Sequence, residues 1–140
     1  QNIQVKGFNL NLDYKVNTTN DKLDLNLKSA YTYLEPKIKQ KEDTQKFSNY
    51  ALENLRHQLV FGQSIRLDQK YSLALHQRYE SRINYKEYIL LDLRAATKLN
   101  DWEIFFDLSN ITNKEIISAG ATPLAGRWYS LGVKWHLDRI

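Results

Sequence analysis

The chain has 140 residues, with 20 lysines and arginines against 16 aspartates and glutamates, and neither cysteine nor methionine. This length suits one domain or a piece of one, and the lack of cysteine excludes a disulfide framework, a thiolate-bound metal and a cysteine nucleophile. The net charge of +4 arises from basic residues scattered among acidic ones, which does not favour nucleic acid as a partner.

Apolar residues recur at every second position through most of the chain, as expected of strands with two unlike faces. This alternation predicts seven strands, at 7–16, 23–33, 58–67, 71–80, 89–99, 102–109 and 127–137. In the last of these, Leu131, Val133 and Trp135 share one face, while Ser130, Gly132 and Lys134 occupy the other. No uninterrupted apolar stretch approaches the roughly 18 residues of a membrane-spanning helix. The predicted fold class is therefore all-β.

The connections between the predicted strands are alternately short and long. Short polar turns lie at 16–22, 67–70 and 99–101, and longer links lie at 35–54, 81–87 and 111–126. Short turns at one rim and long loops at the other are typical of the antiparallel up-and-down barrels of bacterial outer membranes.

On the apolar face, aromatic residues gather toward both ends of the predicted strands. Near the short turns or the chain end lie Tyr14, Tyr71, Trp102 and Trp135, and near the long links lie Tyr31, Tyr33, Tyr79 and Tyr129. From Tyr71 to Tyr79 is roughly 26 Å along a strand, or roughly 20 Å along the membrane normal at a tilt of about 40°, close to the apolar band of outer-membrane barrels. Because amphipathic rings favour both membrane–water interfaces, the two belts predict strands that span a membrane.

Short motifs follow one another in a characteristic order. They are LDLR at 91–94, LNDWEI at 99–104, NITNKE at 110–115 and PLAGRWY at 123–129. The first two resemble the penultimate hairpin of TonB-dependent outer-membrane receptors. The third resembles the Asn-Leu-Phe-Asp-Lys-x-Tyr segment of that family, and the fourth resembles the Pro-x-x-Gly-Arg start of its last strand. Upstream, VKGFNL at 5–10, AYTYL at 30–34 and LRHQL at 55–59 fit earlier strands of that family. The chain departs from the family at Leu137, where an aromatic residue usually closes the pattern, and at Thr112, where Phe is common.

The resemblance implies that residues 1–140 form the C-terminal portion of a plugged barrel of about 22 strands in the bacterial outer membrane. It implies an active-transport receptor, not an enzyme, that takes up a scarce metal chelate such as a ferric siderophore, cobalamin or haem and is energised through TonB. The implied partners are the plug and earlier strands of the receptor, TonB through an N-terminal part, membrane lipid and the chelate, with no cofactor. Since the chain begins at Gln1 without a signal peptide, we expect it to be a segment of a longer protein.

Two sets of residues are candidates for function, one on the polar face and one at the long-loop rim. The residues predicted to face the lumen and plug are Arg66, Arg78, Glu80, Asp92, Arg94, Glu103, Asp107 and Lys134. The residues predicted to face a ligand at the long-loop rim are Arg82, Tyr85, Tyr88, Arg127 and Trp128. Aromatic and cationic groups at a pore mouth suit an anionic metal chelate or a corrinoid. The alternative interpretation is a solvated sheet face with interfacial anchors.

Other classes of function remain as alternatives. A soluble antiparallel β-barrel or sandwich that binds a small apolar ligand would alternate in the same way, and it predicts a monomer that needs no detergent. An outer-membrane enzyme is disfavoured, because Ser72 and His76 would lie roughly 13 Å apart along one strand. The three histidines, His57, His76 and His136, lack the spacing of metal ligands, so no metal site is predicted.

Overall fold

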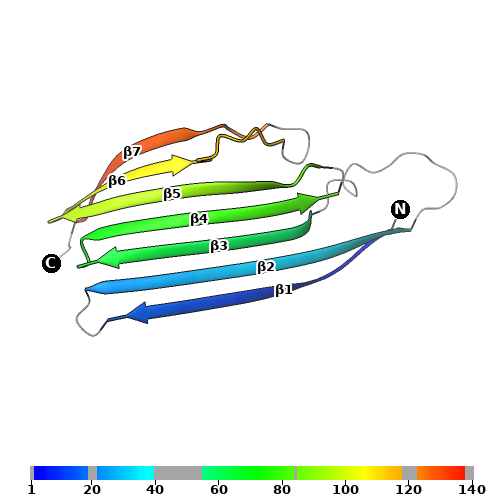
Figure 1. Ribbon diagram of the computed structural model, residues 1–140, viewed down its shortest axis with the longest axis horizontal. Coiled ribbons are helices and arrows are strands. Elements are labelled where there is room, and N and C mark those ends of the chain that lie inside the picture. The colour runs from blue at the N-terminus through cyan, green and yellow to red at the C-terminus, as the bar shows by residue number, and fades with distance from the viewer. Residues whose placement is uncertain (1, 19–21, 40–54, 84, 118–122, 138–140) are drawn as a thin grey trace.

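The structure is a computed structural model that describes residues 2–18, 22–39, 55–83, 85–117 and 123–137. Its strands are β1 (Asn2–Asn17), β2 (Leu23–Lys39), β3 (Leu55–Leu67), β4 (Tyr71–Arg82), β5 (Tyr88–Leu99), β6 (Trp102–Ser109) and β7 (Trp128–Trp135). Each strand pairs antiparallel with the next, so the seven strands form one sheet in chain order (Figure 1). The predicted all-β, up-and-down arrangement is confirmed, and within the described residues the sheet is open.

The first two strands are longer than the alternation predicts. Their pairing continues to Asn2 opposite Lys39, far beyond the predicted limits at residues 7 and 33. Apolar residues still alternate in both extensions, but Val5 and Leu34 have the opposite parity to Phe8 and Tyr33, so the extensions do not continue the apolar face. Hydrogen bonds between the two strands, and not the burial of one face, stabilise the extended segment.

The register of the strands joins their apolar residues into one continuous surface. Leu10 lies opposite Tyr31, which lies opposite Leu59, and that row continues through Tyr79 to Ile89. Because residues directly opposite in neighbouring strands point to the same face, apolar residues predominate on one face of the sheet from β1 to β7, with the polar residues Ser29, Gln63 and Gln77 among them. We call it the apolar face, and the opposite side the polar face.

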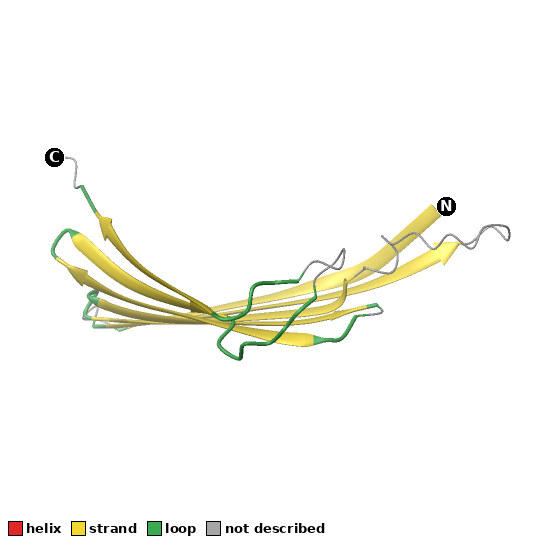
Figure 2. Cartoon of the chain, turned by 90° about the horizontal axis from the view of Figure 1, so that it is seen from above, coloured by secondary structure: helices red, strands yellow, loops and turns green. Residues whose placement is uncertain are grey.

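The sheet is a single twisted layer, and the twist follows from the chirality of the strands. Viewed from above, no second layer of described structure covers either side (Figure 2). Among the described residues, the buried hydrophobic side chains are only Leu90 and Ile116. The leucines of the apolar face therefore do not pack into a dry interior between two layers of this chain.

Candidate functional site

The apolar face is exposed over the length of the strands. Leu12 on one edge strand exposes 68 % of its surface, and Leu131 on the other exposes 76 %. Large apolar residues of the inner strands, such as Leu59, Leu73 and Ile89, are also exposed. Contiguous apolar surface of this extent is rare on soluble monomers and marks contact with a protein partner or a membrane.

Aromatic residues at the short-turn end of this face are held by their neighbours. The rings of Trp102 and Trp135 stack with centroids 5.6 Å apart and an angle of 14° between their planes. Lys70 places its Nζ 5.5 Å from the ring centroid of Tyr71. A lysine above an exposed ring is common where apolar surface gives way to water. Tyr14, on β1, is exposed at the same end.

A second aromatic group lies at the long-loop end and includes residues absent from the sequence-based prediction. The Tyr31 hydroxyl and His57 Nδ1 are hydrogen-bonded at 2.8 Å, and the His57 ring lies 5.1 Å from that of Tyr33. Phe8 completes the group, 5.7 Å from Tyr33. Farther along this end, the Tyr79 hydroxyl donates to Glu87 Oε2 at 2.6 Å. The hydroxyls of Tyr31 and Tyr79 are therefore paired with polar partners, while the rings provide apolar surface.

Tyr129 belongs to the same end of the apolar face but lies on β7. It is 62 % exposed, and its ring lies 6.4 Å from Phe106 at an interplanar angle of 23°. Each aromatic residue predicted for a membrane interface thus has the strand parity of the apolar face. The alternation alone was enough to predict this placement.

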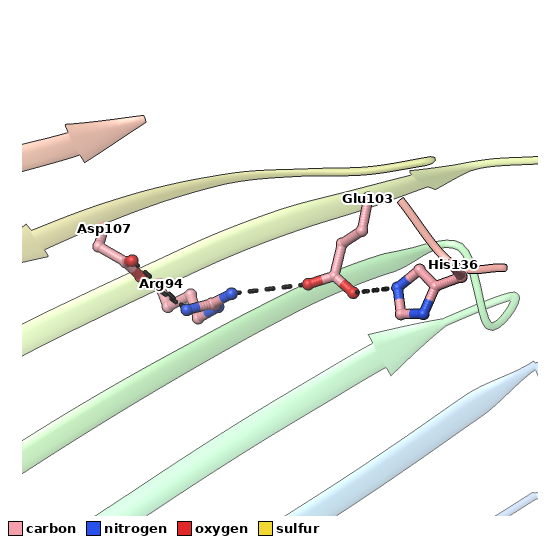
Figure 3. Close-up of polar contacts among 4 residues, drawn as sticks. All are labelled: Arg94, Glu103, Asp107 and His136. Carbon is pink, nitrogen blue, oxygen red and sulfur yellow. Dashed lines mark hydrogen bonds and ion pairs between the residues drawn. The ribbon is translucent and has the colours of Figure 1, made fainter. Parts of the chain in front are cut away.

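On the polar face, Asp107, Arg94, Glu103 and His136 are linked in a chain by ion pairs and a hydrogen bond (Figure 3). The Arg94 guanidinium lies 3.4 Å from Asp107 Oδ2 and 3.6 Å from Glu103 Oε1. The other oxygen of Glu103, Oε2, lies 3.2 Å from His136 Nε2. All four were predicted to lie on this face, whereas the contact of His136, which follows the last residue of β7, with Glu103 was not predicted.

Phe105 fixes the position of Arg94 within this chain. The guanidinium carbon of Arg94 lies 4.2 Å from the centroid of the Phe105 ring, a cation–π contact. The ring itself lies over Gly132, where a Cβ atom would collide with it. Glycine on β7 therefore makes room for the aromatic ring on β6, and that ring supports the arginine.

A second polar-face cluster surrounds Glu80, which is only 4 % exposed. Gln58 Nε2 donates to this carboxylate at 2.9 Å and the Tyr88 hydroxyl at 2.6 Å. An Arg82 nitrogen lies 3.1 Å from Glu80 Oε2, and Arg78 Nε lies 3.7 Å from Oε1. A buried carboxylate requires such partners. Tyr88 and Arg82, both predicted to face a ligand, therefore bond to a lumen candidate.

The remaining rim candidates do not come together. Tyr85 and Tyr88 line a hollow of about 500 Å³ with Ile116, Ile117 and charged residues at 86, 87, 114 and 115. Arg127 instead donates its backbone N–H to Asn113 Oδ1 at 2.9 Å. Trp128 is half-exposed at the start of β7.

Asn110 organises the β6–β7 connection and was not predicted as a key residue. Its side chain is buried, its Nδ2 donates to the Lys114 carbonyl at 2.9 Å and its Oδ1 accepts from the Lys114 N–H at 3.1 Å. Its own N–H donates to Asp92 Oδ1 at 2.8 Å. Asp92, a predicted lumen residue, therefore anchors this loop. The signal available in the sequence was the motif that begins at Asn110.

The last two lumen candidates, Lys134 and Arg66, lie in the short-turn half of the polar face. Lys134 is opposite Glu103 in the register, and Arg66 is opposite both Asp24 and Ser72.

In the described ranges, no group of three or more His, Cys, Asp or Glu residues is placed to hold a metal ion. No α-helix in those ranges is long and apolar enough to cross a membrane. No protein-family model, curated protein or solved structure matches the chain.

Proposed function

We propose that this chain forms part of the wall of an outer-membrane β-barrel, in a TonB-dependent receptor that takes up a scarce metal chelate. The observation that supports this most directly is the exposed apolar face, which runs through all seven strands and carries aromatic residues at both ends. Burial of one leucine or phenylalanine side chain is worth about 1.5–3 kcal/mol. Contact with hydrocarbon gives this whole face a stable environment.

The open edges of the sheet support the same proposal. β1 and β7 each have one neighbour in the described structure, so each leaves a row of backbone N–H and C=O groups unpaired on its outer side. In hydrocarbon such groups must pair within the protein, which requires a closed barrel. Further strands of the receptor would supply that closure, with the Arg94 and Glu80 clusters facing the lumen and its plug.

The transport role rests on the sequence motifs and on the rim. The ordered motifs from residue 5 to residue 129 are similar to those of TonB-dependent receptors. At the long-loop end, the hollow beside Tyr85 and Tyr88 combines aromatic rings with two lysines, Lys86 and Lys114, and two glutamates, at 87 and 115. The aromatic rings are the part of this lining that suits a metal chelate or a corrinoid. Binding would occur at this rim, and plug movement driven through TonB would release the ligand inward.

The membrane part of the proposal is tested by a pair of arginine substitutions on neighbouring residues of β7. Leu131→Arg puts a charge on the apolar face and Ser130→Arg puts the same charge on the polar face. In lipid vesicles, Leu131→Arg should lower the free energy of unfolding by about 2–4 kcal/mol, and Ser130→Arg by much less, because a cation near the bilayer centre loses its hydration. Denaturant titration of tryptophan fluorescence measures both.

The opposite result has a clear meaning. If Leu131→Arg is neutral and the protein stays monomeric without detergent, the apolar face does not meet lipid, and a soluble barrel or sandwich replaces this proposal.

The transport part is tested separately, by uptake of radiolabelled ferric chelates, haem and cobalamin into cells with and without the gene. Uptake that is independent of the gene, or unaffected when the proton-motive force is collapsed, would refute energised transport.

A further inference from the structure

A hollow of about 450 Å³ lies on the polar face at the short-turn end. Its floor consists of short side chains, because Ser72 on β4 lies opposite Ala96 on β5 in the register. Longer side chains border this floor on both sides. Arg66 on β3 lies opposite Ser72, and Phe105 on β6 lies opposite Ala96. The hollow therefore results from short residues on β4 and β5 that lie between longer residues on β3 and β6.

The side chains around the hollow are predominantly basic. Its basic lining residues are Arg66, Lys70, Arg94, Lys98 and His136, and its acidic lining residue is Glu103. Glu103 is already engaged by Arg94 and His136. An excess of positive charge consequently faces the same half-open hollow, where it would attract an anion.

Two of these cations are available to a ligand. Within the described ranges, neither the Arg66 guanidinium nor the Lys98 ammonium forms an ion pair or a side-chain hydrogen bond. The Lys98 backbone N–H donates to the Lys70 carbonyl at 2.7 Å, which holds the two lysines at the same end of the hollow. Arg94 is drawn toward β6 by Asp107 and by the ring of Phe105. The floor between Arg66 and Arg94 therefore stays clear.

We propose that this hollow binds a compact oxyanion of the phosphate class. A phosphate group carries up to two negative charges and presents several acceptor oxygens. A guanidinium recognises such oxygens in a two-pronged geometry, and lysines add point charges. The Ser72 hydroxyl on the floor supplies a further donor. This site lies on the polar face, so the inference rests on the barrel part of the proposed function but not on the identity of the transported ligand.

The test measures phosphate binding to the full protein, purified with its natural partner strands in a nonionic detergent. Inorganic phosphate and pyrophosphate are titrated by calorimetry at constant ionic strength. The double variant Arg66→Gln/Lys98→Gln removes the two unpaired cations. Its matched control, Lys15→Gln/Lys28→Gln, removes the same charge from the same face on β1 and β2. Lipid nanodiscs containing phosphatidylglycerol form a second arm, which distinguishes a headgroup from a free phosphate compound.

We expect saturable phosphate binding that the Arg66→Gln/Lys98→Gln variant weakens by about tenfold or more, with little change in the control. Binding of phosphatidylglycerol with the same variant dependence would support the same site with a lipid source. Equal weakening in both double variants would overturn the proposal, because it would indicate diffuse attraction. Absence of phosphate and headgroup binding would overturn it too, as would selective binding of an acidic peptide in their place.

Discussion

Arg94 joins β5 to β6 through its ion pairs with Glu103 and Asp107. The three residues share one face because successive side chains of a strand point to opposite sides. Their ion pairs depend instead on the register between β5 and β6, which alternation does not determine. For the same reason, the bond between Tyr88 and Glu80 was not foreseen.

Asn110 provides a test at the residue scale, because Asn100 serves as a matched control. Both asparagines have positive φ, 50° and 54°, but only Asn110 is buried with its side chain bonded to the β6–β7 loop. Asn110→Gly should lower the free energy of unfolding by about 1–3 kcal/mol, since it leaves buried backbone groups of the loop unpaired. Asn100→Gly should change it by less than about 0.5 kcal/mol.

Denaturant titration of the two variants in the same micelle gives this comparison. Hydrogen exchange at the Lys114 amide, which bonds to Asn110 Oδ1, should accelerate only in Asn110→Gly. Equal stability losses in the two variants would show that the side-chain hydrogen bonds of Asn110 contribute no stability beyond that of its backbone conformation.

At the scale of the element, alternation predicted every strand because each one separates two unlike environments. It predicted strand ends less well. β1 and β2 continue past the point where the apolar residues change parity, at Val5 and Leu34, since backbone pairing does not require a continuous apolar face. The tight connections were recognised from turn-forming residues, but the sequence did not specify their backbone angles. In the β3–β4 turn, Asp68 and Gln69 both have positive φ, at 49° and 52°.

The β3–β4 turn gives a prediction at this scale. A bond from the Lys70 N–H to the Leu67 carbonyl, 2.9 Å long, closes the turn, and two successive positive φ angles are the mark of a type I′ hairpin. Gln69→Gly should therefore raise the free energy of unfolding by about 0.5–1 kcal/mol, because glycine adopts this conformation without steric cost. Gln69→Ala retains the steric cost of a positive φ and should therefore not raise the free energy of unfolding. A gain of equal size in both variants would contradict the explanation.

At the scale of the molecule, the number of strands limits how the sheet can close. Six successive antiparallel pairings make β1 and β7 run in the same direction. Copies arranged around the membrane normal would place β7 of one chain beside β1 of the next as parallel neighbours. Antiparallel outer-membrane barrels contain an even number of strands. An odd number of further strands is therefore needed to complete a barrel.

Pairing of like edges, β7 with β7 and β1 with β1 of a second copy, is the remaining way for the chain to close with itself. A two-fold axis would make these strands antiparallel, but it would put long loops on both sides of the membrane.

The chain has no cysteine, so single cysteines introduced one at a time at positions 129–135 report on this contact. In native membranes with an oxidant we expect no disulfide-linked dimer, while the outward amides of β7 exchange slowly because a different strand covers them. The double variant Phe106→Cys/Leu131→Cys, register partners on β6 and β7, verifies that the oxidant reaches this face. A strong dimer at one scanned position would show that two copies share the β7 edge, and fast exchange of its outward amides would show that no strand covers it.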